Sequence, residues 1–196
     1  MHVLNNRRIT ISGIAVIFPG IGYNTDKPLL YYSKKIAMNK GFETFVNVEY
    51  KDLTFNKGTL IKDKAAQREV FKKCLLCANE SLKDINWSEY DKILFISKSL
   101  GTIVASAVSS EMSVNVKHIL FTPLEETFEY KVNDALGFIG TADPWSDYGK
   151  VIELAKKQNI PMHSFDGANH SIETKDVLKD IVYIKETMEI VESFIE

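Results

Sequence analysis

Three residues whose side chains can together perform nucleophilic catalysis occur along the chain in the order Ser99, Asp143 and His170. In such a set the serine hydroxyl attacks a carbonyl carbon and the histidine accepts the hydroxyl proton as a general base. The aspartate orients the imidazole and stabilises its charged form. The serine then carries the acyl group until water releases it. These residue types predict acyl transfer, with Ser99 as nucleophile, His170 as base and Asp143 as orienting acid.

Ser99 lies in a segment with the pattern small-x-Ser-x-Gly, which reads Ser97-Lys98-Ser99-Leu100-Gly101. A strand that turns sharply into a helix needs small residues on both sides of the nucleophile, and Ser97 stands here where glycine is usual. The turn exposes the Ser99 hydroxyl at a helix N-terminus, where the Leu100 N–H can meet developing negative charge. Lys98 is expected to point away from the site as a solvated or ion-paired neighbour. The alternative role for Ser99 is that of a helix cap.

Asp143 and His170 each follow the end of a predicted strand. Asp143 precedes a proline, so it could instead cap the next helix. Asp147 and Asp166 are rival acids for the histidine. Asp147 falls a helical turn beyond the strand end, and Asp166 belongs to the histidine's own loop. Asp143 is therefore the preferred partner of His170.

The loop Pro19-Gly20-Ile21-Gly22-Tyr23 follows an earlier predicted strand and supplies a second candidate donor for an oxyanion. Its glycines let the backbone amides turn toward the site, so the N–H groups of Ile21 and Leu100 form the predicted oxyanion hole. A glycine-rich loop would also suit a phosphate, but neither G-x-G-x-x-G nor G-K-[ST] is present. Nucleotide binding is not expected.

The elements that must position these residues are short apolar, β-branched runs that alternate with longer helix-like segments. The predicted strands are Ile14–Phe18, Phe42–Val48, Lys92–Ile96, Lys117–Phe121, Leu136–Ile139 and Met162–Phe165. The predicted helices are Lys27–Asn39, Lys62–Lys83, Leu100–Met112, Trp145–Gln158 and Asp176–Ile195. This alternation indicates an α/β fold with a doubly wound, mostly parallel sheet of about six strands and helices on both faces. Sites in such sheets form at the carboxyl ends of the strands, where all three residues fall.

Composition narrows the possible partners. A chain of 196 residues with 45% hydrophobic and 26% charged residues is typical of a single globular domain over residues 1–196. The 24 basic and 26 acidic residues form no block of like charge, so neither nucleic acid nor a membrane surface is expected as a partner. Cys74 and Cys77 lie within a predicted helix as packing residues, and the histidines show no metal-binding spacing. We therefore expect neither a metal nor a cofactor.

The location is predicted from the cysteines and the N-terminal region. Two cysteines in one helix give no disulfide framework, which suits a reducing compartment. The apolar run Ile9–Phe18 resembles a short signal peptide, but no small-residue cleavage site follows it. The run is also too short to span a membrane. These features predict a cytoplasmic protein.

Over nearly its whole length the chain resembles the α/β-hydrolase superfamily. Pro19–Gly22 resembles the superfamily's His-Gly oxyanion motif with Pro19 in place of His, and residues 97–101 resemble its nucleophile elbow. Residues 140–143 and 167–170 resemble its acid and histidine loops. The chain is most similar to small lidless hydrolases akin to dienelactone hydrolases and short-chain carboxylesterases. The dienelactone group uses a cysteine nucleophile, so Ser99 favours the esterase-like side.

This resemblance implies a minimal hydrolase fold with a trimmed sheet, and the interval Thr122 to Ala135 is too short for a cap domain. It implies a serine hydrolase acting on a small-molecule acyl substrate, a carboxylic ester or thioester. A peptidase or acyltransferase with the same triad, and a non-catalytic binding module, remain alternatives. His118 and His163 are expected to be packing or edge residues. Candidates to line the acyl pocket, or alternatively core and rim residues, are Tyr23, Leu124, Phe128 and Trp145.

Overall fold

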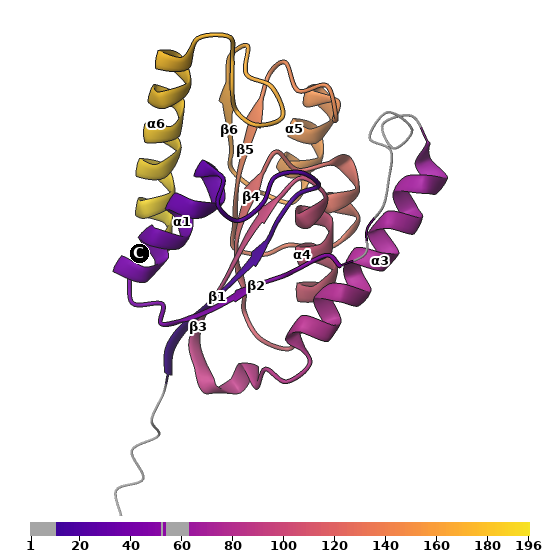
Figure 1. Ribbon diagram of the computed structural model, residues 1–196, viewed down its shortest axis with the longest axis vertical. Coiled ribbons are helices and arrows are strands. Elements are labelled where there is room, and N and C mark those ends of the chain that lie inside the picture. Colours follow the sequence, from indigo (N-terminus) through magenta and orange to yellow (C-terminus); the bar gives the residue numbers. More distant parts are fainter. Residues whose placement is uncertain (1–10, 52, 54–62) are drawn as a thin grey trace, which may run out of the picture.

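The computed structural model describes residues 11–51, 53 and 63–196, and its centre is a six-stranded sheet (Figure 1). The strands are β1 (Ile11–Phe18), β2 (Thr44–Asn47), β3 (Tyr90–Lys98), β4 (Lys117–Phe121), β5 (Ala135–Gly140) and β6 (Met162–Phe165). They are all parallel, in the order β2-β1-β3-β4-β5-β6. The predicted α/β fold is confirmed, and the sheet is parallel throughout.

Within the described residues, five helices connect or follow the strands, one in each region where the sequence predicts a helix. They are α1 (Pro28–Asn39), α3 (Lys64–Leu82), α4 (Leu100–Ser110), α5 (Tyr148–Lys157) and α6 (Val177–Ile195). Helix α5 begins later than predicted because the Asp147 carboxylate accepts a hydrogen bond of 3.1 Å from the Lys150 N–H and caps the helix. The start predicted for α3 at Lys62 lies outside the described residues. Two short 3₁₀ helices, η1 (Trp87–Glu89) and η2 (Glu125–Glu129), complete the described elements.

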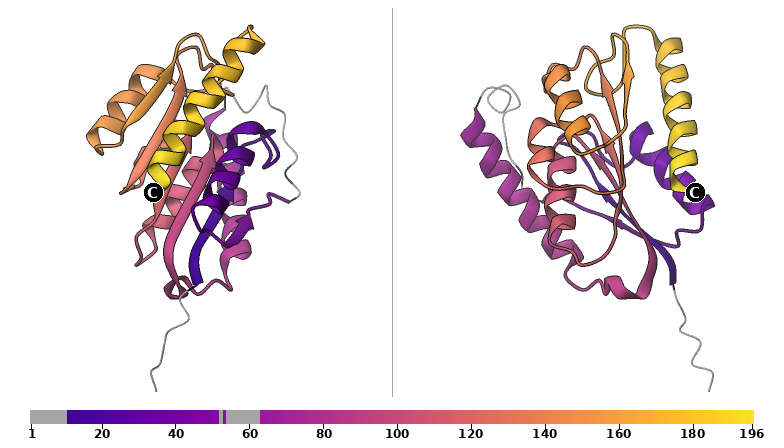
Figure 2. Two further views of the ribbon diagram at one scale, coloured as in Figure 1. Left: turned by 90° about the vertical axis from the view of Figure 1, so that its left-hand side faces the viewer. Right: turned by 180° about the vertical axis from the view of Figure 1, so that it is seen from behind.

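The helices cover both faces of the sheet, with α1 and α6 on one face and α3, α4 and α5 on the other (Figure 2). Successive residues of a strand point to opposite faces, so a strand buried on both faces must be apolar throughout. In β1, Ala15 and Ile17 pack into the cluster that contains α1 and α6, whereas Ile14 and Val16 pack with α3 and α4. Cys74, which is fully buried, packs in the second cluster as expected from the sequence.

The chain reverses its direction of winding beside β1. From β1 it passes through α1 to β2 at the edge of the sheet, and then returns through α3 to β3 on the other side of β1. The loops that follow β1 and β3 therefore separate at the carboxyl edge of the sheet, which is the usual place for a ligand crevice in such folds. The interval between β4 and β5 holds η2, in agreement with the expectation that it carries no cap.

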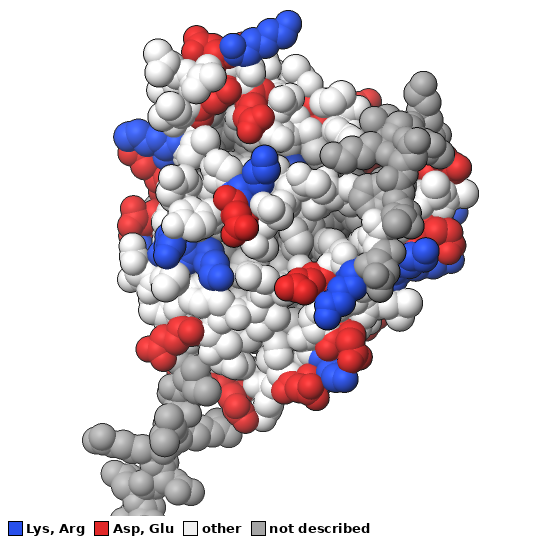
Figure 3. Space-filling model, viewed as in Figure 1, with Lys and Arg blue, Asp and Glu red and all other residues white. Residues whose placement is uncertain are grey.

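Surface charge on the face shown in Figure 3 is mixed, with lysines and arginines interspersed among acidic residues. Within the part of the chain that the structure describes, none of the helices combines the length and apolar character that crossing a bilayer requires.

Candidate active site

Ser99 occupies a sharp turn between a strand and a helix. Strand β3 ends at Lys98 and α4 begins at Leu100, and Ser99 between them has φ 55° and ψ −125°. A non-glycine residue with positive φ is strained, and such strain concentrates at functional sites, where the surrounding structure enforces it. The Ser99 N–H donates to the Phe121 carbonyl at 2.9 Å, which ties the turn to β4. The turn thus projects the Ser99 side chain from the edge of the sheet.

The residues on each side of Ser99 show why the turn needs small side chains. A Cβ at Gly101 would collide with the carbonyl groups of Phe18 and Pro19 at the end of β1. Ser97, where glycine is usual, is fully buried and donates a hydrogen bond of 3.0 Å from its hydroxyl to the Ile119 carbonyl. The serine is accommodated because its one polar group has a partner.

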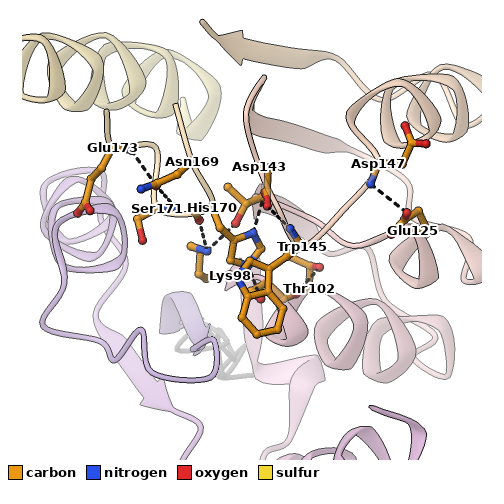
Figure 4. Close-up of polar contacts among 12 residues, drawn as sticks. Lys98, Thr102, Glu125, Asp143, Trp145, Asp147, Asn169, His170, Ser171 and Glu173 are labelled. Atoms are coloured by element: carbon orange, nitrogen blue, oxygen red, sulfur yellow. Dashed lines mark hydrogen bonds and ion pairs between the residues drawn. The ribbon is translucent and has the colours of Figure 1, made fainter. Parts of the chain in front are cut away.

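The structure brings Ser99, His170 and Asp143 together, and Figure 4 shows the contact between His170 and Asp143. His170 Nε2 lies 2.7 Å from Ser99 Oγ, and His170 Nδ1 lies 2.7 Å from Asp143 Oδ2. The second carboxylate oxygen of Asp143 accepts a 2.8 Å hydrogen bond from the Trp145 N–H, which fixes the orientation of the carboxylate. The Ser99 hydroxyl is therefore directed to the imidazole rather than to the helix backbone.

Burial sets the protonation state of the histidine. It lowers the pKa of His170, and the nearby Lys98 ammonium lowers it further, whereas the hydrogen bond to Asp143 and the charge of Asp143 act in the opposite direction. A lowered pKa keeps the imidazole neutral near pH 7, the form that can accept a proton from a serine. The electrostatics of the site therefore suit a general base.

The loops that carry Asp143 and His170 are joined to each other. The Ala142 N–H donates to the Ala168 carbonyl at 3.0 Å, and a Cβ at Gly140 would collide with that same carbonyl. Glycine at the end of β5 therefore lets the loop after β6 approach closely enough for His170 to reach Asp143. Asn169 stabilises the histidine loop by accepting a hydrogen bond of 2.7 Å from the Ser171 N–H.

The rival acids take other roles. Asp147 caps α5, and its own N–H donates to Glu125 at 3.1 Å, on the side away from His170 in Figure 4. The Asp166 carboxylate lies 3.5 Å from the Thr141 hydroxyl, and its main-chain carbonyl accepts hydrogen bonds from side chains of α6. Only Asp143 of the three is joined to His170 by a hydrogen bond in the described structure.

The two predicted oxyanion donors lie at the mouth of one cavity. Gly20 and Tyr23 exchange backbone hydrogen bonds of 3.2 and 3.3 Å, so the loop after β1 folds into a tight turn with Ile21 at its tip. A Cβ at Gly20 would stand 3.1 Å from the Ser99 Cβ, which shows how closely this turn approaches Ser99. Leu100 is the first residue of α4, whose first-turn N–H groups have no acceptor within the helix. The oxyanion role of both residues stays a prediction.

A cavity of about 710 Å³ opens beside Ser99 and His170. Tyr23, Leu124 and Trp145, predicted as pocket residues, line it, together with Ile21 and Leu100. Phe128 lies elsewhere, because η2 places its ring in the core cluster with Leu120 and Val151, where the ring is removed from water. The wall formed by α3, α4 and Tyr130 is not foreseen from the sequence, and its apolar members are Val70 and Phe71 of α3, Ile103 of α4 and Tyr130.

The expectation for Lys98 is wrong. Its side chain is only 1% exposed, and Nζ donates hydrogen bonds of 2.5 Å to the Thr122 hydroxyl and 2.6 Å to the His170 carbonyl. The cause is that β3 continues to Lys98 instead of ending at Ile96, so Lys98 points to the same face of the sheet as Ile96. That face is covered by the loops of the site. If the predicted strand is extended from Ile96 to Lys98, its alternation of faces predicts that the Lys98 side chain points to this covered face.

Two further histidines, His118 and His163, pack against aromatic rings. His118 is 1% exposed and packs edge-on against Phe95 at 5.4 Å between ring centroids, in agreement with the packing role expected. His163 instead stacks on Phe138, with 5.5 Å between the ring centroids. A search of the residues that the structure describes finds no group of three or more histidine, cysteine or acidic side chains arranged to hold a metal ion.

Comparisons with known proteins identify the fold of this chain. No protein-family profile and no curated protein matches the sequence. Among solved structures, Est1E from Butyrivibrio proteoclasticus matches with a TM-score of 0.66 and 13% identity, covering 94% of this chain and 87% of that one. An esterase of Pyrococcus furiosus matches with a TM-score of 0.63 and 14% identity, covering 95% and 83%.

A serine hydrolase without a lid from Xanthomonas campestris matches with a TM-score of 0.59 and 12% identity, covering 90% of this chain and 79% of that one. All three comparisons extend over nearly the whole of this chain. The protein therefore has the α/β-hydrolase fold, and it is similar in structure to proteins that are named hydrolases or esterases.

Proposed function

We propose that the protein is a serine hydrolase that cleaves a small carboxylic ester or thioester through an acyl-enzyme on Ser99. The observation that carries this proposal is the pair of 2.7 Å contacts by which His170 joins Ser99 to Asp143. This is the arrangement in which a weak nucleophile is activated by a base that a third group orients. The lowered pKa of His170 supports it, because the base is then unprotonated at neutral pH.

The reaction starts when Ser99 Oγ attacks the substrate carbonyl carbon and its proton passes to His170 Nε2. The resulting imidazolium is stabilised by the Asp143 carboxylate, and the oxyanion of the tetrahedral intermediate accepts hydrogen bonds from the N–H groups of Leu100 and Ile21. The intermediate collapses as the C–O or C–S bond breaks and His170 gives its proton to the leaving group. Water, deprotonated by His170, then attacks the acyl-enzyme and regenerates Ser99.

The cavity supports an apolar acyl group. Val70 and Phe71 of α3, Ile103 of α4 and Leu124 contribute apolar surface, and the volume of about 710 Å³ exceeds what an acetyl group needs. The charged side chains that line the cavity are of both signs and include Arg68, Lys72, Glu126, Glu129 and Lys150. Because acidic and basic side chains both line the cavity, we expect modest selectivity among esters rather than selection of a strongly charged substrate.

The first experiment measures hydrolysis of p-nitrophenyl acetate and p-nitrophenyl butyrate by the wild type and by Ser99→Ala. The wild type should turn over both esters, and Ser99→Ala should lose at least a thousandfold in kcat, the scale of loss when a triad nucleophile is removed. Ser110→Ala is a matched control, because Ser110 lies at the far end of the same helix with its hydroxyl bonded to the Ala107 carbonyl. Equal turnover by Ser99→Ala and the wild type would contradict the proposal.

A further inference from the structure

The Lys98 ammonium lies beneath the site with a partner for each of its three N–H donors. Two are the oxygens of Thr122 and of the His170 main chain, at 2.5 and 2.6 Å, and the third is the face of the Tyr23 ring, whose centroid lies 5.1 Å from Nζ. An aromatic face attracts a cation, and a buried cation is stable only when its donors are satisfied. No proton transfer and no hydrogen bond to the substrate in the proposed mechanism involves this side chain.

Burying Lys98 costs free energy, because its ammonium group is removed from water. Burial lowers the pKa of Lys98 to about 7, against the more distant charges of Asp143 and Glu173, which raise it. Among the described residues no carboxylate forms an ion pair with Nζ. A methionine would fill a similar volume without any desolvation cost. The stability of the fold therefore gives no reason for a lysine at this position.

Thr122, the acceptor of one of these hydrogen bonds, is itself in an unfavourable conformation. It follows the last residue of β4 with φ 43°, which a β-branched residue rarely adopts. A hydrogen bond of 2.7 Å from its N–H to the Phe138 carbonyl holds the backbone there. A strained backbone thus presents the Thr122 hydroxyl to a buried ammonium, which in turn binds the backbone of the histidine loop.

We propose that Lys98 is a positioning residue that holds the His170 main chain in place for catalysis. Its charge also disfavours protonation of the His170 ring. The anchor acts on the backbone of the residue whose imidazole must reach Ser99 and Asp143 at once. The charged and titratable groups that face Nζ are His170 and Glu173 from the loop after β6, Asp143 from the loop after β5 and Tyr23 from the loop after β1. The effect on turnover rests on the proposed function, but the effect on His170 does not.

The test uses three variants. Lys98→Met removes the charge and both hydrogen bonds while keeping the length of the side chain. Thr122→Val keeps the charge and the β-branched shape but removes one acceptor. Lys117→Met is the matched control, because Lys117 donates to the Phe194 carbonyl at 2.8 Å from the opposite end of β4.

Two readouts are measured on each protein. One is the pH dependence of kcat and KM for p-nitrophenyl butyrate, and the other is the pKa of His170 from NMR titration of carbon-13-labelled imidazoles, with His170→Asn for assignment. Lys98→Met should lower kcat roughly tenfold to a hundredfold with little change in KM, the cost of a small misplacement of a catalytic group. It should also raise the pKa of His170, because the charge of the Lys98 ammonium is removed.

Thr122→Val should lower kcat less and leave the His170 pKa near that of the wild type, whereas Lys117→Met should change neither. The proposal is overturned if the His170 pKa is the same in Lys98→Met and the wild type, or if kcat is unchanged. If Lys98→Met does not fold, Thr122→Val decides, and an unchanged kcat in that variant overturns the anchoring role. Failure of the proposed function looks different, because an inactive wild type would still show the His170 titration.

Discussion

The burial of Lys98 predicts an unusual dependence of stability on pH. In the unfolded chain its pKa has the ordinary value of 10.5, and in the folded protein it falls to about 7. Between these values the unfolded state binds one proton more than the folded state, so the wild type gains stability as pH rises through this window. Below it the ammonium is charged in both states and its full desolvation cost is present. Lys98→Met lacks this titration altogether.

The size of the effect follows from the linkage. Each pH unit of such a proton difference changes the free energy of unfolding by about 1.4 kcal/mol. Because Lys98 is only half deprotonated near pH 7, the wild type should gain roughly 2 kcal/mol relative to Lys98→Met between about pH 7 and about pH 9. The loss of two hydrogen bonds changes the stability of Lys98→Met by the same amount at both pH values. It therefore does not affect the gain of the wild type between them.

The assay is urea unfolding of both proteins at several values of pH, followed by circular dichroism. The free-energy difference between wild type and Lys98→Met should move in favour of the wild type between about pH 7 and about pH 9, above the range in which His170 titrates. A difference that stays constant up to about pH 9 would refute the reasoning, because it would mean that the folded state does not depress the pKa of this lysine.

Further predictions concern the hydrolysis of p-nitrophenyl esters, with the butyrate as the standard substrate, and the thermal stability of the protein. Asp143→Asn should lower kcat by several thousandfold with intact folding, because the imidazole loses its orienting anion; a loss below tenfold would contradict this. The acid limb of the kcat/KM profile should fall at a pH below 6.5, the ordinary value for histidine, because the pKa of His170 is lowered. Gly101→Ala should lower the melting temperature and abolish turnover, because its Cβ meets the carbonyls at the end of β1; wild-type values would contradict this. Ile103→Trp should narrow the cavity and reduce kcat/KM for the octanoate ester at least tenfold more than for the acetate; a proportional loss would contradict the assigned acyl wall.

Much of the fold follows from local patterns in the sequence. Strands β4 and β6 have the same bounds in the structure as in the prediction, and β4 is buried from His118 to Phe121, as expected of a strand that helices cover on both faces. Parallel strands end at one edge of the sheet, so residues that follow β3, β5 and β6 could be expected to meet there. The positions of Ser99, Asp143 and His170 after these strands therefore predict from the sequence alone that the three side chains meet.

Other features depend on contacts that no local pattern reveals. Phe71 lines the cavity only because α3 packs over α4, and Phe128 is turned into the core by η2. The prediction for Lys98 was wrong because a charged residue at a strand end is usually solvated. Its burial depends on Thr122 and on the His170 carbonyl, which are supplied by two distant loops.

The most direct measurement of the central claim is covalent labelling by a fluorophosphonate, with the modified residue located by mass spectrometry of peptides. A fluorophosphonate reacts with a serine only where a base activates the hydroxyl and N–H donors stabilise the resulting oxyanion. The account predicts stoichiometric modification of Ser99 in the wild type, strongly slowed modification in His170→Asn and none in Ser99→Ala. An unmodified Ser99 in the folded wild type, or labelling that does not depend on His170, would contradict it.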